Sequence, residues 1–154
     1  MTRTRSAPHL LRAAGALAAA ALAAVTVATP AQADAPRGRT ERVSVGLGQR
    51  QPDGASNAAG LSADGRFAVF TSKAANLVPG DTNGKSDVLV RNQWTGRTER
   101  VSVATDGSQA AGASERPFVD ALGTTVLFTS EDGTLVPGDT NQAPDVFLRR
   151  LPLL

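Results

Sequence analysis

The sequence predicts an all-β protein built from two similar halves. The heptapeptide LVPGDTN occurs at 77–83 and again at 135–141, which is 58 residues later. Between glycine- and proline-rich turns, short segments alternate polar and apolar residues or run apolar, as strands do. No segment after residue 33 keeps the apolar period of a helix.

The first 33 residues differ from the rest. Three arginines precede an uncharged, alanine-rich run at 13–28, which leads into ATPAQAD, and the alanines there meet the small-residue rule for cleavage after Ala33. The run is too short and too weakly apolar for a permanent span, which needs about 20 apolar residues. We therefore expect a signal peptide at 1–33 and a mature domain at 34–154 without a membrane span. The protein would be exported, either secreted or kept in the cell envelope or periplasm.

Charge and composition exclude several functions. The chain has 16 basic and 14 acidic residues, and loss of the three arginines with the signal leaves 13 against 14, a net charge of −1. No basic stripe remains, so nucleic acid is not an expected partner. The single histidine, His9, lies in the signal, and cysteine is absent. The commonest general base and the thiol nucleophile are thus missing, which favours a non-enzymatic protein.

The repeat extends well beyond the heptapeptide. A shift of 58 residues places GRTERVSV (38–45) on GRTERVSV (96–103) and DVLVR (87–91) on DVFLR (145–149), without a gap. About half of the aligned positions are identical, and self-similarity at such a period predicts stacked supersecondary units. The repeats span about 38–95 and 96–154.

Each repeat predicts about four short antiparallel strands. In the first they are Thr40–Val45, the glycine-rich stretch Gly54–Ser62, Phe67–Ser72 and Asp87–Arg91, with Asp64-Gly65 as a hairpin turn. A four-stranded antiparallel sheet repeated along the chain is the blade of a β-propeller. The predicted fold class is therefore all-β with two β-propeller blades, the chain starting on the last strand of one blade.

The motif order resembles a known family. LSADGRFAVFTS, LVPGDTN and DVLVRN…TG…TERVSV, within Arg39–Arg149, resemble the repeats of TolB-like, WD-repeat-like β-propellers of exported bacterial proteins. The resemblance implies a binding protein of the cell envelope, although some propellers of the family are fused to enzymes. The second copy has DALGT at 120–124, so Asp64 has no equivalent there.

Two blades are fewer than the usual 4–8 of a propeller. Several chains could complete a ring, which makes a homo-oligomer a candidate partner arrangement. The chain could instead be a partial propeller left from a longer gene, or a small open pair of sheets.

The GDTN loops offer a candidate cation site. Carboxylate and amide oxygens are ligands for Ca²⁺, the one candidate cofactor. Alternatively, Asp81 and Asp139 hydrogen-bond their own loop backbone, while Asp87 and Asp145 begin the next strands. The candidate metal ligands are Asp81, Asn83 and Asp87 and their copies Asp139, Asn141 and Asp145.

Trp94, the single tryptophan, lies in the predicted turn NQWTG and is the candidate ligand-binding residue. An exposed indole can stack on a sugar or anchor a protein, or it can pack on a neighbouring strand. The pairs Glu41-Arg42 and Glu99-Arg100 are expected to be solvated charges at sheet edges.

The predicted function is an exported binding or scaffold module that engages a protein or an envelope polymer through its blade loops. A calcium-stabilised or carbohydrate-binding module is one alternative. A truncated propeller remnant without its own activity is the other.

Overall fold

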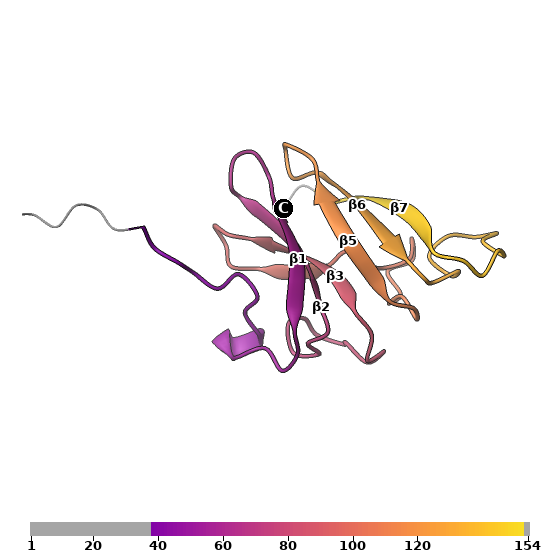
Figure 1. Ribbon diagram of the computed structural model, residues 1–154, viewed down its shortest axis with the longest axis horizontal. Coiled ribbons are helices and arrows are strands. Elements are labelled where there is room, and N and C mark those ends of the chain that lie inside the picture. Colours follow the sequence, from indigo (N-terminus) through magenta and orange to yellow (C-terminus); the bar gives the residue numbers. More distant parts are fainter. Residues whose placement is uncertain (1–37, 153–154) are drawn as a thin grey trace, which may run out of the picture. The chain divides into compact units, whose positions relative to one another are not determined.

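The computed structural model describes residues 38–152, and this part of the chain is all-β, with two antiparallel sheets (Figure 1). The first sheet consists of β1 (Ser56–Leu61), β2 (Phe67–Ser72), β3 (Asp87–Asn92) and β4 (Thr98–Arg100). The second sheet consists of β5 (Ser114–Val119), β6 (Thr125–Ser130) and β7 (Asp145–Arg150). In each sheet, every strand pairs with the next along the chain. The expected signal peptide at 1–33 lies outside the described residues.

Most of the predicted strands are confirmed, including β1 within the glycine-rich stretch 54–62. The prediction of a strand at Thr40–Val45 is wrong: none of these residues belongs to a strand, and the next residue, Gly46, makes only an isolated bridge to Arg50. Its copy forms β4 because the edge of β3 offers a partner, with Leu89 opposite Arg100. Thr40–Val45 has no such partner strand in the described part of the chain, and an extended segment without a ladder is not a strand.

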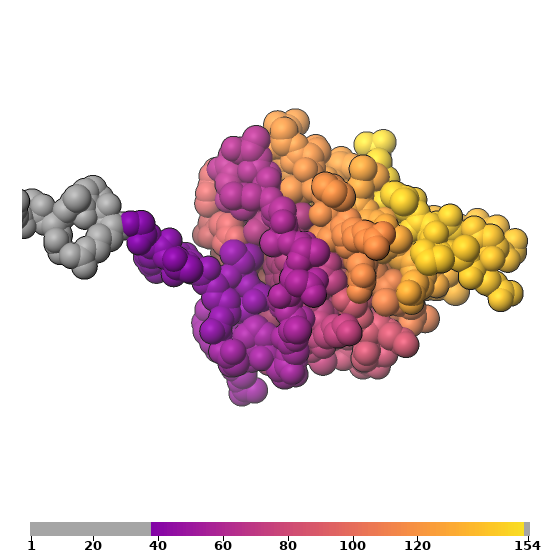
Figure 2. Space-filling model, viewed as in Figure 1, coloured from indigo at the N-terminus to yellow at the C-terminus, as the bar shows by residue number. Residues whose placement is uncertain are grey.

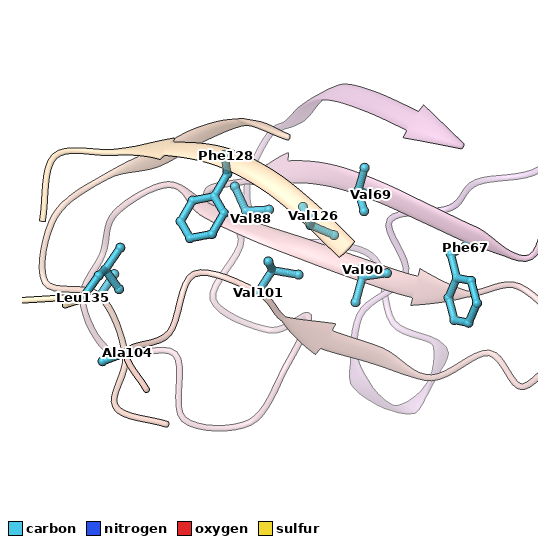
Figure 3. Packing of buried hydrophobic residues seen from close by; sticks show 10 residues of the cluster. Phe67, Val69, Val88, Val90, Val101, Ala104, Val126, Phe128 and Leu135 are labelled. Atoms are coloured by element: carbon cyan, nitrogen blue, oxygen red, sulfur yellow. The ribbon is translucent and has the colours of Figure 1, made fainter. Parts of the chain in front are cut away.

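The core lies between the two sheets (Figure 3). Val69, Val88 and Val90 project from the first sheet toward Val126 and Phe128 of the second, and all five are buried. Burial of each such side chain contributes roughly 1.5–3 kcal/mol. A second cluster covers the opposite face of the first sheet. It consists of Phe70, Ala74, Leu77, Val78 and Leu89, with Val43 packed against it. β2 is therefore buried on both faces, which explains its unbroken apolar run.

Residues of the repeated GAS and FTS motifs bring the start of the first strand of each sheet close to the end of the second strand. A Cβ on Gly54 would lie 2.6 Å from the carbonyl carbon of Lys73, and one on Gly112 would lie 2.8 Å from that of Glu131. Only glycine allows this approach. In each sheet a serine hydroxyl of the first strand then bonds one of the second at 2.9 Å, through Ser56 to Ser72 and Ser114 to Ser130.

A β-bulge also repeats. The register shifts between Asn57 and Gly60 in β1 and between Glu115 and Phe118 in β5. The extra residue has a positive φ in both sheets, 47° at Ala58 and 56° at Arg116. Ala58 and Arg116 stand 58 positions apart, so the backbone of the first strand in each sheet repeats even where its letters differ.

Candidate functional site

Trp94 lies in the turn between β3 and β4, and 71% of its surface is exposed. The guanidinium carbon of Arg66 lies 4.9 Å from the centre of the Trp94 ring and 4.7 Å from that of Phe67. Both distances are within the range of cation–π contact. The guanidinium of Arg66 therefore contacts both the exposed indole of Trp94 and the buried ring of Phe67, and one face of the indole packs on it.

Asn92 fixes the turn that carries the indole. Its side-chain oxygen accepts hydrogen bonds from the amides of Trp94 at 3.0 Å and Thr95 at 3.2 Å. The amide of Gly96, whose φ is 74°, donates to the carbonyl of Asn92 at 2.8 Å. This is the turn chemistry expected of Asn and Gly, so the sequence NQWTG presents Trp94 in one backbone conformation.

The β1–β2 turn is held by Asp64. Its carboxylate accepts from the Ser62 hydroxyl at 2.6 Å and from the Arg66 amide at 2.9 Å. These bonds, with that of Ser62 the larger effect, lower the pKa of Asp64. The turn is tied to the turn of Trp94, because the amide of Gln93 donates to the carbonyl of Arg66 at 2.7 Å.

The β5–β6 turn uses Asp120 in a similar way, although its sequence DALGT departs from SADGR. The amide of Thr125 is the main group that lowers the pKa of Asp120, and the hydroxyl and amide of Thr124 add to the effect. Gly123 allows the turn to lie on the Phe67 ring, since a Cβ there would be 2.1 Å from a ring carbon. Leu122, 73% exposed, stands at the tip.

These three turns form one surface, which we call the turn face and define as Ser62–Arg66, Asn92–Gly96 and Asp120–Thr124. The amide of Ala63 donates to the carbonyl of Ala121 at 3.0 Å, which links the first sheet's turn to the second's. The turn face thus combines two exposed apolar side chains, Trp94 and Leu122, with a backbone fixed by hydrogen bonds.

The candidate cation ligands lie at the opposite end of the strands. Asp87 begins β3, as predicted, and Arg100 lies between it and Asp81: Nε is 3.2 Å from Asp87 Oδ2, and Nη2 is 3.6 Å from Asp81 Oδ2. The side chains of Arg100, Asp81 and Asp87 are 9%, 5% and 1% exposed. The prediction of Arg100 as a solvated edge charge is therefore wrong, because the Pro79–Asn83 loop folds over it.

Three further polar groups complete this cluster. Gln109 donates from Nε2 to Asp81 at 3.1 Å and to Asp87 at 3.3 Å, and Ser102 donates to Asp87 at 2.8 Å. Asn83 donates to the carbonyl of Ala110 at 2.9 Å. Burial raises the pKa of Asp87, against the effects of Ser102 and Arg100. Asp81 thus binds residues far along the chain, not its own loop backbone as the alternative interpretation expected.

The second loop has the same letters but different surroundings. Asn141 donates to Asp145 at 2.9 Å, and Asp145 begins β7 as predicted. Asp139 and Asp145 are only partly buried. Among residues 38–152, no three His, Cys, Asp or Glu side chains gather in a group that could hold a metal ion. Binding of Ca²⁺ by these loops stays a prediction.

No protein-family model, curated protein or solved structure matched the chain. Within the described residues, no helix is long and apolar enough to cross a membrane.

Proposed function

We propose that the protein is an exported, non-enzymatic binding module whose two sheets are blades of a TolB-like β-propeller. In support, the first sheet is a four-stranded meander, and it packs face to face on a second sheet whose sequence repeats the same motifs. Blades of a propeller pack in this manner around a common axis.

We further propose that the turn face is the binding surface, for a protein or an envelope polymer. The observation that carries this proposal is the exposed indole of Trp94 supported by Arg66. An exposed large apolar ring costs solubility, and aromatic anchors of this kind dominate binding surfaces. Because the turns are already fixed by hydrogen bonds, a ligand would bind with little loss of backbone freedom.

Fluorescence titration tests this proposal, because Trp94 is the only tryptophan. The purified protein is titrated with soluble peptidoglycan fragments, with chito-oligosaccharides and with an arrayed peptide library. We expect one of these probe classes to shift the indole emission with a saturable dependence.

Two variants, measured by calorimetry with the same probe, locate the site. Trp94→Ala should weaken binding at least about tenfold, the effect of losing a central aromatic anchor. Lys73→Ala is the matched control, because Lys73 is exposed at the far end of β2 and should bind as the wild type does. If no probe class shifts the emission, or if Trp94→Ala retains full affinity, the proposal is wrong.

A further inference from the structure

The second sheet has one face that is apolar and exposed. Phe118 pairs with Leu127, and Leu127 pairs with Leu148, so these three side chains form a row across β5, β6 and β7. They are 71%, 43% and 53% exposed, and Val146, two residues before Leu148 on the same face, is 71% exposed. We call Phe118, Leu127, Val146 and Leu148 the open face.

The first sheet shows what covers this face in the other copy of the repeat. Val69, Val88 and Val90 stand 58 positions before Leu127, Val146 and Leu148, and they are at most 1% exposed. They are covered by the second sheet, through Val126 and Phe128. The open face is thus the position of a further sheet of the same kind.

The edge of β7 is open as well. Within the described residues, β3 pairs with β2 on one side and with β4 on the other, whereas β7 pairs only with β6. β7 lies at the margin of the second sheet, away from the segment that begins at Arg39 (yellow and indigo in Figure 2).

The segment Arg39–Gln51 carries copies of the three side chains that contact Asp81 and Asp87 in the first sheet. GRTERVSV at 38–45 is identical to the stretch that forms β4, so Arg42 and Ser44 correspond to Arg100 and Ser102. Gln51 corresponds to Gln109, which again stands 58 positions later. The carboxylates Asp139 and Asp145 correspond to Asp81 and Asp87, which receive Arg100, Ser102 and Gln109 in the first sheet.

This segment already lies against the first sheet as the end of β4 lies against the second. Val43 packs on the cluster that contains Phe70 and Leu77. Its copy Val101 packs in the cluster that contains Phe128 and Leu135, each 58 positions on. A second copy whose segment paired with β7 would therefore bring its own first sheet onto the open face. Arg42, exposed and bonded to the exposed Gln51, is available for this exchange.

We propose that Arg39–Gln51 of a second copy of this chain adds to the edge of β7 and supplies Arg42, Ser44 and Gln51 to Asp139 and Asp145. The interface is head-to-tail, so each copy offers a segment at one side and an edge at the other, and the contact can repeat until a ring closes. It does not involve the turn face, so it stands or falls separately from the proposed ligand site.

Native mass spectrometry of the purified protein tests the assembly. We expect a complex of two or more copies, and Arg42→Glu or Asp145→Lys alone should each shift it to monomer. The two variants are complementary, because Arg42→Glu leaves the edge of β7 intact and Asp145→Lys leaves the segment Arg39–Gln51 intact. Their mixture should form a complex with one copy of each. Lys73→Glu is the matched control, since Lys73 is exposed and lies outside both the segment and the edge of β7, and it should assemble normally.

A cross-link tests the register without disturbing charge in the cluster. Thr98 pairs with Arg91 in the first sheet, which corresponds to Thr40 of one copy beside Arg149 of another. The chain has no cysteine, so Thr40→Cys with Arg149→Cys introduces the only two thiols. We expect oxidation to link different copies covalently. A wild-type monomer at micromolar concentration, or cross-linking only within one copy, would overturn the proposal.

Discussion

Replacement of Arg100 by methionine should cost the first sheet a large part of its stability. Methionine keeps most of the buried volume but removes the cation that contacts Asp87 at 3.2 Å and Asp81 at 3.6 Å. Both carboxylates are at most 5% exposed, so water cannot replace the arginine without opening the loop. Loss of one partner of a buried ion pair costs about 3–5 kcal/mol. For a domain of this size that corresponds to a fall in Tm of roughly 12–20 °C.

The assay is thermal unfolding followed by circular dichroism at neutral pH. The control is Arg97→Met on the same strand, because the Arg97 side chain is 69% exposed and its pair with Glu99 should contribute less than about 1 kcal/mol. A triple variant, Arg100→Met with Asp81→Asn and Asp87→Asn, removes the stranded charges and should recover much of the loss.

The pH dependence gives a second check on the same variant. Burial already raises the pKa of Asp87, and removal of Arg100 should raise it further. A carboxyl whose folded pKa exceeds its unfolded value of 3.8 favours folding more as the pH falls through the folded pKa. The deficit of Arg100→Met should therefore shrink between pH 7 and pH 4. A loss below about 1 kcal/mol, or a deficit independent of pH, would refute the role assigned to Arg100.

The remaining predictions concern single turns. Gly123→Ala should destabilise the protein by about 1–3 kcal/mol in urea unfolding, because the new Cβ would meet the Phe67 ring and φ is 70°. The control is Gly65→Ala, which should cost only about 1 kcal/mol because the space there is open and φ is a similar 72°. Equal losses for the two variants would contradict the ring contact. Asp132→Ala removes the acceptor of the Ala111 amide at 2.6 Å and of two bonds from Thr134, and should cost about 1–3 kcal/mol in the same assay. Burial alone would raise the pKa of Asp132, but these bonds lower it, so its contribution is present above pH 3.8 and is lost as the pH falls below that value. The wild type should therefore lose stability faster below pH 3.8 than Asp132→Ala does, and parallel acid limbs in the two unfolding curves would contradict this.

Most strands could be predicted because their signals are local. The apolar run of β2 and the turn letters that follow β1 and β3 fix those elements without reference to the rest of the chain. Thr40–Val45 could not be predicted in this way. Its letters are identical to those at 98–103, and only the presence of a neighbouring edge decides whether they form a ladder.

Only part of the candidate site could be predicted from the sequence. The position of Trp94 in a turn was predicted, but the turn alone left exposure and packing on a strand both open. The contact with Arg66 depends on how two hairpins meet, which no local pattern encodes. Burial of Arg100 was missed for a related reason: alternation separates Glu99 and Arg100 onto opposite faces but does not say which face a loop covers. One signal in the sequence could have revealed the buried cluster. Arg100, Ser102 and Gln109 have copies 58 positions earlier, and Asp81 and Asp87 have copies 58 positions later, so the whole set recurs with the repeat.

The unequal burial of the two repeats has a definite pattern. Phe70 and Phe128, which lie on the corresponding faces, are both 3% exposed. On the open face the differences are large: Val88 is 0% exposed and Val146 71%, and Val90 is 1% exposed and Leu148 53%. A copy that had adapted to water would carry polar or charged residues there, as exposed sheets and edges usually do. Instead, Phe118 stands where the first copy has Gly60, so this face carries more apolar surface in the second copy. Such surface is unfavourable in water and favourable when it packs against another sheet.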